Sequence, residues 1–279
     1  MLQLGKKQEL EIVKVVDFGV YLAEKKGAAA EERVLLPKKE VPAGAGEGTR
    51  LTVFLYKDSR DRLIATMREP MLTVGSTAVL KVKEVAKIGA FLDWGLEKDL
   101  LLPFRQQTRK VHMDEEVLVG LYVDKSDRLC ATMKVYGYLS TESPYKKDDH
   151  VTGVVYEISE QFGVFVAVDQ KYSALIPRRE ASGTYRVGDR IEARVTAVKE
   201  DGKLDITDRE KAYLQIEEDA EAILSVIEEF DGVLPFTDKA SPEVIKREFG
   251  LSKAAFKRGV GKLLKEGKIE ITERSIRIL

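Results

Sequence analysis

The first 210 residues contain three copies of one pattern, and this repetition restricts the fold more than any other feature. Its clearest mark is an apolar residue followed by Gly, a small residue and an aromatic, at 18–21, 88–91 and 162–165. A Leu/Ile-Pro step follows in each copy. A closing segment then ends the copy, most alike at 61–67 and 127–133 and looser at 202–207. We therefore predict three related structural units.

Each unit has the pattern of about five short strands, punctuated by Gly and charged turns. In the second unit the strands are expected at 78–85, 89–94, 100–102, 117–123 and 129–133. Alternating segments of this length and spacing predict a small closed barrel of the OB type. Solenoid repeats are usually about 20 to 45 residues long. Because these units are longer and carry enough apolar strand to bury their own cores, tandem barrels are favoured and the fold class is mainly β.

Spacing shows where the copies differ. Pro37 follows Gly19 by 18 residues, whereas the matching step is 14 in the other copies, which predicts a loop insertion within 25–32. Extra length before the third copy indicates an exposed linker, rich in polar residues. The expected domains are repeats at 1–68, 69–136 and 146–210 with a linker at 137–145, followed by a last domain at 211–279.

The period changes from two to helical at about Lys211. Apolar residues then recur at helical spacing, namely Ile216, Ala220, Ile223, Ile227 and Phe230. Ser241 followed by Pro242 predicts the start of a second helix that Gly250 ends. Ser252 predicts the cap of a third helix to about Glu266, with its buried side formed by Phe256, Val260, Leu263 and Leu264. With strands at 268–271 and 275–279, these elements predict a winged helix.

Composition narrows the range of partners. Lys+Arg 46 against Asp+Glu 47 gives a net charge of -1, so any nucleic-acid site must be local. One cysteine, Cys130, and two histidines, His112 and His150, predict neither a disulfide nor a metal site, and we expect no cofactor. No segment approaches about 18 uninterrupted apolar residues, so no membrane partner is predicted. A reducing cytoplasm fits this pattern.

The aromatic-Gly pattern resembles the RNA-binding motif of ribosomal protein S-one, a five-stranded OB-fold module. In that motif two aromatics, a histidine and an Asp-Arg pair line the RNA surface. The resemblance implies RNA-binding roles for Phe18, Tyr21, Asp58, Arg62, Phe91, Asp124, Arg128, Phe162, Phe165 and Lys203. The chain departs from the motif in two ways. Ile88 replaces the first aromatic of the second copy, and the histidine place is taken by Pro37, Pro103 and Pro177.

Physical chemistry supports these roles. An exposed ring can stack on an RNA base for roughly 1 to 3 kcal/mol. Basic residues beside the rings can hold phosphates, namely Lys38, Lys39, Arg105, Arg178 and Arg179. Residues three apart on a regular strand face opposite sides. Either a bulge at Gly19 brings Phe18 and Tyr21 to one surface, or one ring of each pair fills the core.

The third predicted helix carries Lys257, Arg258, Lys262 and Lys265, of which the last three share its outer side. This cationic face is a candidate nucleic-acid contact. A solvated face or a docking surface remains the alternative.

Over nearly its whole length, the order of three such repeats and a winged helix resembles the bacterial conserved virulence factor B family. The most specific match is the stretch 241–250, reading Ser-Pro-Glu-Val-Ile-Lys-Arg-Glu-Phe-Gly, with 255–258 and 267–269 after it. Members of that family are RNA-binding regulators of gene expression. The resemblance implies a non-catalytic, post-transcriptional regulator whose partner is single-stranded RNA.

Three other classes compete with this interpretation. A nuclease lacks support, because no clustered carboxylates or His-based acid/base pair is evident, and the Asp58/Arg62 and Asp124/Arg128 pairs look like turn ion pairs. A DNA-binding transcription regulator is the second. A scaffold that docks ribosomes or other proteins through the barrels is the third.

Overall fold

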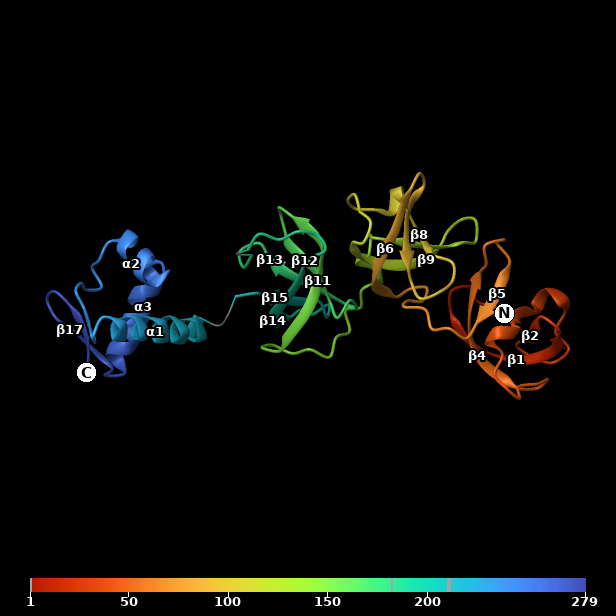
Figure 1. Cartoon of the computed structure of the whole chain (residues 1–279), viewed down its shortest axis with the longest axis horizontal. Helices are drawn as coiled ribbons and strands as arrows, with labels where there is room; N and C mark the ends of the chain where they lie inside the picture. Colours follow the sequence, from red (N-terminus) through yellow and green to blue (C-terminus); the bar gives the residue numbers. More distant parts are fainter. Residues whose placement is uncertain (1, 182, 210–211) are drawn as a thin grey trace. The chain divides into compact units, whose positions relative to one another are not determined.

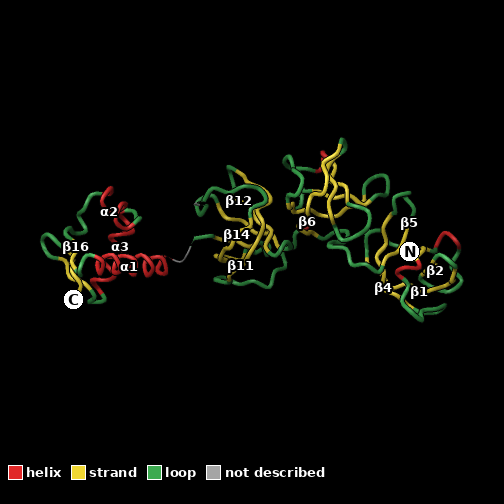
Figure 2. The backbone as a smooth tube through the Cα atoms, viewed as in Figure 1, coloured by secondary structure: helices red, strands yellow, loops and turns green. Residues whose placement is uncertain are grey.

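A computed structural model describes residues 2–181, 183–209 and 212–279 of the chain. It divides into two compact units, Met1–Asp208 and Arg209–Leu279. The first unit contains three closed five-stranded barrels, and the second contains three helices and a small sheet (Figure 1). Figure 2 shows this division as strands in the barrels and α-helices in the C-terminal unit. The predicted fold class is confirmed.

All three barrels share one topology, in which the fifth strand lies between the third and the fourth. The third and fifth strands pair in parallel, and the other described pairs are antiparallel. The strands of the first barrel are β1 (Lys7–Val16), β2 (Gly19–Ala23), β3 (Val34–Pro37), β4 (Arg50–Lys57) and β5 (Leu63–Thr66). A short 3-10 helix, η1 (Ala30–Glu32), lies within the predicted insertion.

The second and third barrels repeat this order. The second has β6 (Thr77–Ala86), β7 (Gly89–Asp93), β8 (Leu100–Pro103), β9 (Glu116–Val123) and β10 (Leu129–Thr132). The third has β11 (His150–Ser159), β12 (Gly163–Val168), β13 (Tyr172–Pro177), β14 (Arg190–Val198) and β15 (Leu204–Thr207). The five strands predicted for the second barrel are all confirmed, with small differences at their ends.

Each barrel closes around its own apolar core, because alternate strand residues point inward. In β2 and β3, for example, Val20, Leu22, Val34 and Leu36 are buried. One irregularity recurs on the first strand of each barrel, where the register shifts by one residue. In the first barrel the shift lies between Ile12 and Lys14, so the bulge considered at Gly19 is found instead on β1.

The repeated glycine has a steric cause. At Gly163 the backbone φ is 122°, and an added Cβ would lie 2.1 Å from the Ile176 carbonyl oxygen. Gly19 and Gly89 face the corresponding carbonyls at 2.2 and 2.3 Å. Only glycine permits this approach between the second and third strands. Each of these glycines is the first residue of its strand, so the residue before it lies in the turn rather than on the strand.

The segment between the second and third barrels is more buried than predicted. Leu139 is buried, and the Ser140 backbone pairs with β13, where its N–H donates to the Lys171 carbonyl at 2.8 Å. An added Cβ at Gly202 would lie 2.3 Å from the Thr141 carbonyl oxygen, so this segment also packs closely on the β14–β15 turn. The polar composition indicated exposure, but backbone hydrogen bonds hold the segment on the third barrel.

The C-terminal unit packs α1 (Ala212–Glu229), α2 (Pro242–Phe249) and α3 (Lys253–Lys265) with a sheet of β16 (Val233–Leu234), β18 (Ile276–Ile278) and β17 (Ile269–Ile271). The predicted caps are confirmed. Ser241 Oγ accepts from the Val244 N–H, and Ser252 Oγ accepts from the Ala255 N–H. The two-residue β16 was not predicted.

Two apolar residues of this unit lie differently from their prediction. Leu264 is 46% exposed rather than part of the buried side of α3, and Phe230 lies beyond the end of α1, with its side chain partly exposed. Phe256, Val260 and Leu263 are buried as predicted. Among the described residues, no helix combines the length and apolar character that crossing a membrane requires.

Candidate nucleic-acid interface

The second aromatic of each pattern lies on the outer face of its barrel. Tyr21 pairs with Leu35, which pairs in parallel with Ile64, and all three side chains are partly exposed. In the third barrel the same row is Phe165, Leu175 and Asp205. The second barrel has Phe91, Leu101 and the buried Cys130. The strand register therefore builds the same short row across each barrel.

The first aromatics extend this row from the turn. Phe18 is 59% and Phe162 56% exposed, and Ile88 is equally exposed in the second barrel. The ring centroids of Phe18 and Tyr21 are 6.4 Å apart, and those of Phe162 and Phe165 are 6.5 Å apart, both edge to face. Each pair thus shares one surface, so the interpretation that one ring fills the core is wrong. Their contact with RNA stays a prediction.

The third barrel has a hollow at this surface. A groove of about 600 Å³ is lined by Phe162, Phe165, Leu175 and Lys203, among others. It is also lined by Tyr136, which comes from η4 (Tyr136–Tyr138) after the second barrel and was not predicted as a site residue. The sequence did carry a signal, because two tyrosines flank Gly137 next to the predicted linker.

The predicted cations of the third barrel differ in their hydrogen bonds and ion pairs. Arg178 donates from its guanidinium to the Glu160 carbonyl, and its backbone N–H donates to the Phe162 carbonyl at 3.0 Å. Lys203 is paired with Asp201 at 2.7 Å, and this hydrogen bond raises the pKa of Lys203. Arg179 is largely exposed and lies 3.7 Å from Glu180. Of these three predicted cations, Lys203 lines the groove, whereas Arg178 lines a separate hollow with Gly163 and Val164.

In the first barrel the predicted turn ion pair is present. Asp58 Oδ1 accepts from the backbone N–H groups of Arg60 and Arg62, and its Oδ2 accepts from the Arg62 guanidinium at 2.7 Å. Partial burial raises the pKa of the Asp58 carboxyl, but the hydrogen bonds and the charge of Arg62 outweigh it, and the pKa lies below its ordinary value. Asp58 thus closes the β4–β5 turn and orients Arg62.

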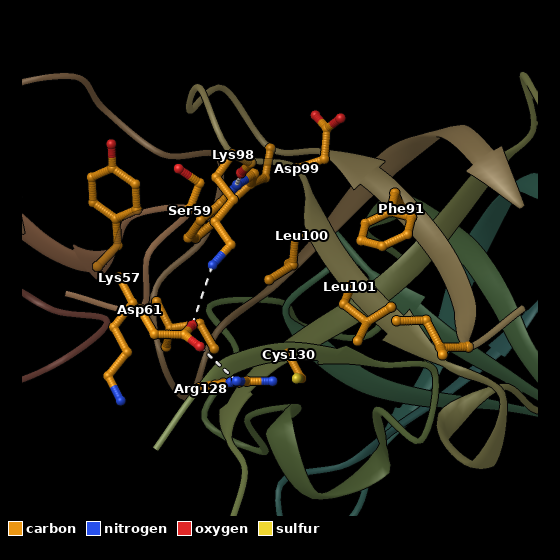
Figure 3. Close-up of a pocket in the computed structure, with 14 residues that line it drawn as sticks. Lys57, Ser59, Asp61, Phe91, Lys98, Asp99, Leu100, Leu101, Arg128 and Cys130 are labelled. Carbon is orange, nitrogen blue, oxygen red and sulfur yellow. Dashed lines mark hydrogen bonds and ion pairs between the residues drawn. The ribbon is translucent and has the colours of Figure 1, made fainter. Parts of the chain in front are cut away.

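In the second barrel the predicted turn ion pair is wrong. Asp124 accepts the Arg128 backbone N–H at 3.0 Å, but the Arg128 guanidinium turns to Asp61 of the first barrel at 2.5 Å. Lys98 approaches the same Asp61 carboxylate at 3.7 Å. Figure 3 shows Asp61 facing both cations. The pocket that these residues line has a volume of about 270 Å³, and Phe91 also lines it. The first barrel therefore supplies an acid to the candidate surface of the second.

The cations after the Leu/Ile-Pro step also differ in availability. Lys39 forms an ion pair with Glu97, across the first two barrels. Lys38 and Arg105 are exposed, and neither is in an ion pair among the residues that the structure describes. These two side chains are therefore the freer candidates in their barrels.

The cationic face of α3 is smaller than its sequence indicated. Lys262 lies 2.8 Å from Glu217 of α1 and 3.5 Å from Glu266, and it is mostly covered. Lys257 approaches Asp238 at 3.9 Å. Arg258 and Lys265 are exposed, with no ion pair described for either in 212–279. Arg258 and Lys265 are thus the main candidates for phosphate contact.

Comparison with protein families matches every domain. Models described as S1 domain match residues 4–68 and 74–134, and one described as S1 RNA binding domain matches 145–210. A CvfB-like winged helix domain matches 221–278. Three S1 barrels with a winged helix define a nucleic-acid-binding protein.

The relatives identify the family. The chain is 30% identical to the uncharacterized protein YitL of Bacillus subtilis, over 95% of this chain and 90% of that protein. It is 27% identical to Conserved virulence factor B of Staphylococcus aureus strain N315, over 81% of each. The chain belongs to the conserved virulence factor B (CvfB) family.

A solved structure matches the same arrangement of domains. It is the crystal structure of a multidomain protein with nucleic acid binding domains from Streptococcus pneumoniae TIGR4. Its sequence is 25% identical, the match covers 99% of this chain and 98% of that one, and the TM-score is 0.50.

Proposed function

We propose that this chain is a cytoplasmic, non-catalytic regulator that binds single-stranded RNA through the outer faces of its barrels. The third barrel is the principal site, and the winged helix adds phosphate contacts. The protein would then regulate a transcript by binding to it rather than by catalysing a reaction on it. Single strands suit these faces because unpaired bases are free to stack on protein rings.

The observation that supports this proposal most is the pair formed by the exposed Phe162 and the partly buried Phe165, which line an open groove. Soluble domains normally bury phenylalanine, whereas the Phe162 ring is 56% exposed. Lys203, on the β14–β15 turn, lines the same groove as the two rings and places a positive charge beside them. Rings for bases next to cations for phosphates form the usual combination of a single-strand site.

The test is binding of the full chain to a labelled, unstructured RNA of about 12 nucleotides, within the ~4–16 that one OB barrel covers. Fluorescence anisotropy across a salt series gives both affinity and its salt dependence. We expect the logarithm of affinity to fall with the logarithm of salt at about −0.7 per phosphate contact. Equal affinity for a matched DNA duplex would instead assign the protein to DNA.

A substitution then locates the site. Phe162→Ala should weaken RNA binding by the loss of one stack, about 1–3 kcal/mol. The ring lies in a turn and largely in solvent, so the barrel should keep its melting temperature. Phe230→Ala, which removes a partly exposed ring from the C-terminal unit, is the matched control and should leave affinity unchanged.

A further inference from the structure

Tyr136 is a half-exposed tyrosine outside every matched domain. It lies between the stretches 74–134 and 145–210, and its side chain is 52% exposed. It nevertheless lines the same groove of about 600 Å³ as Phe162 and Phe165 of the third barrel. A half-exposed ring at this groove is not expected of a segment that serves only as a linker between two barrels.

The backbone around Tyr136 is fixed on both sides. Before it, Val135 is fully buried. After it, Tyr138 packs on Gly120 of β9, where an added Cβ would lie 3.0 Å from the tyrosine ring, and Leu139 is buried in a cluster that contains residues of the second and third barrels. Because both flanks are anchored, the backbone that carries Tyr136 is held beside the groove.

A cation lies beside the ring. Lys203 Nζ is 5.8 Å from the Tyr136 ring centroid, within the range of a cation–π interaction, and Asp201 holds the same ammonium at 2.7 Å. Lys203 thus joins the β14–β15 turn of the third barrel to the ring from η4. The groove has aromatic walls from two different parts of the chain.

We infer that Tyr136 is a base-binding residue, which extends the Phe162–Phe165 surface so that consecutive bases of a single RNA strand stack across the groove. The inference rests on the proposed function and adds a residue contributed from outside the S1 domains. A volume of about 600 Å³ lies within the ~300–1,000 Å³ of ordinary small-molecule sites, so nucleotides fit. The site is complete only when the segment after β10 is docked on the third barrel.

The experiment compares Tyr136→Leu with the unsubstituted full chain, using the same labelled RNA of about 12 nucleotides. Leucine keeps an apolar side chain but removes the π-face. We expect affinity to fall about 5- to 150-fold, the equivalent of ~1–3 kcal/mol for one stack. Tyr136→Phe restores the ring and should recover affinity to within about twofold, since stacking needs only the π-face.

A second measurement separates contact from an indirect effect. RNA carrying 4-thiouridine is irradiated in complex with the full chain, and the cross-linked peptides are mapped by mass spectrometry. A cross-link within the peptide containing Tyr136, lost in Tyr136→Leu, is expected. Melting temperatures of both variants should match the unsubstituted protein, since the ring is half in solvent.

The outcomes distinguish the inference from the function on which it rests. If Phe162→Ala weakens binding while the folded Tyr136→Leu protein binds unchanged, the inference is overturned and the third barrel remains an RNA site. If the unsubstituted chain shows no preference for single-stranded RNA, the proposed function itself fails. If Phe is no better than Leu at position 136, a stacking role is excluded.

Discussion

Asp61 of the first barrel forms an ion pair with Arg128 of the second, with 2.5 Å between Oδ2 and Nη2. Arg128 stands where the resemblance to the S-one motif places an RNA-contacting arginine. The Asp61 carboxylate therefore pairs with an arginine that would otherwise be available to bind an RNA phosphate. It also approaches Lys98, so one acid faces two cations (Figure 3).

Removing this acid should strengthen RNA binding. Asp61→Asn takes away the negative charge and keeps a residue that tolerates the left-handed backbone found there, φ 58°. With Arg128 released, one more phosphate contact should form, and the salt dependence should steepen by about 0.7 in the log-log slope. Affinity across a salt series measures both effects.

Asp127→Asn is the matched control. Asp127 occupies the corresponding turn position of the second barrel, with φ 54°, and no ion pair is described for it within 2–181. The control should bind RNA like the unsubstituted chain, apart from a small change in general charge. Equal gains from both substitutions would show that Asp61 acts through net charge alone and not through Arg128.

The barrels were predictable because their signals are local. Strand alternation, Gly turns and the Leu/Ile-Pro step recur in sequence, and each copy folds around its own apolar residues. The aromatic sites followed from the same repeats. The question of how Phe18 and Tyr21, three residues apart, can face the same side also has a local answer. Phe18 lies in the turn before β2 and so shares a surface with Tyr21.

Contacts between copies were not predictable in the same way. Asp61 looked like a turn residue, and its pairing with Arg128 depends on how two barrels meet. Tyr136 ended the second predicted repeat, next to a polar linker whose composition indicated exposure, but backbone hydrogen bonds hold Ser140 of that linker on the third barrel. Likewise, the sequence predicts Lys262 as a surface cation, but in the structure it forms an ion pair with Glu217 of α1. Such pairings leave no periodic mark in the sequence.

The repeated glycine should be intolerant of any side chain. Gly163→Ala would bring a Cβ to 2.1 Å from the Ile176 carbonyl oxygen at a positive φ, so the third barrel should lose at least about 1–3 kcal/mol of unfolding free energy. Urea unfolding followed by circular dichroism measures this loss. Gly46→Ala is the control, because nothing lies within 4 Å of its added Cβ. Equal stability of the two variants would contradict the steric explanation.

Cys130 should be an unreactive thiol in the folded protein. Burial, followed by the nearby Asp124 carboxylate, raises its pKa to about 11, so at pH 8 only about one thiol in a thousand is ionised. Labelling by a disulfide reagent should be slow at that pH and fast in urea. Because the folded pKa is raised, the stability linked to this group is complete below about pH 8.5 and is lost as pH rises toward 11. Rapid labelling of the native protein would contradict burial.

Two kinds of cation on α3 should respond differently to charge reversal. Arg258 and Lys265 are exposed, so replacing both with Glu should weaken RNA binding and flatten its salt dependence, because each lost phosphate contact removes a counterion-release term. Lys262 instead joins α3 to Glu217 of α1, so Lys262→Glu should lower the melting temperature of the C-terminal unit. The loss of affinity should be smaller than for Phe162→Ala, since α3 offers no described stacking ring on this face. If the folded Arg258/Lys265 double variant binds RNA with unchanged affinity and salt slope, the winged helix serves protein docking rather than RNA contact.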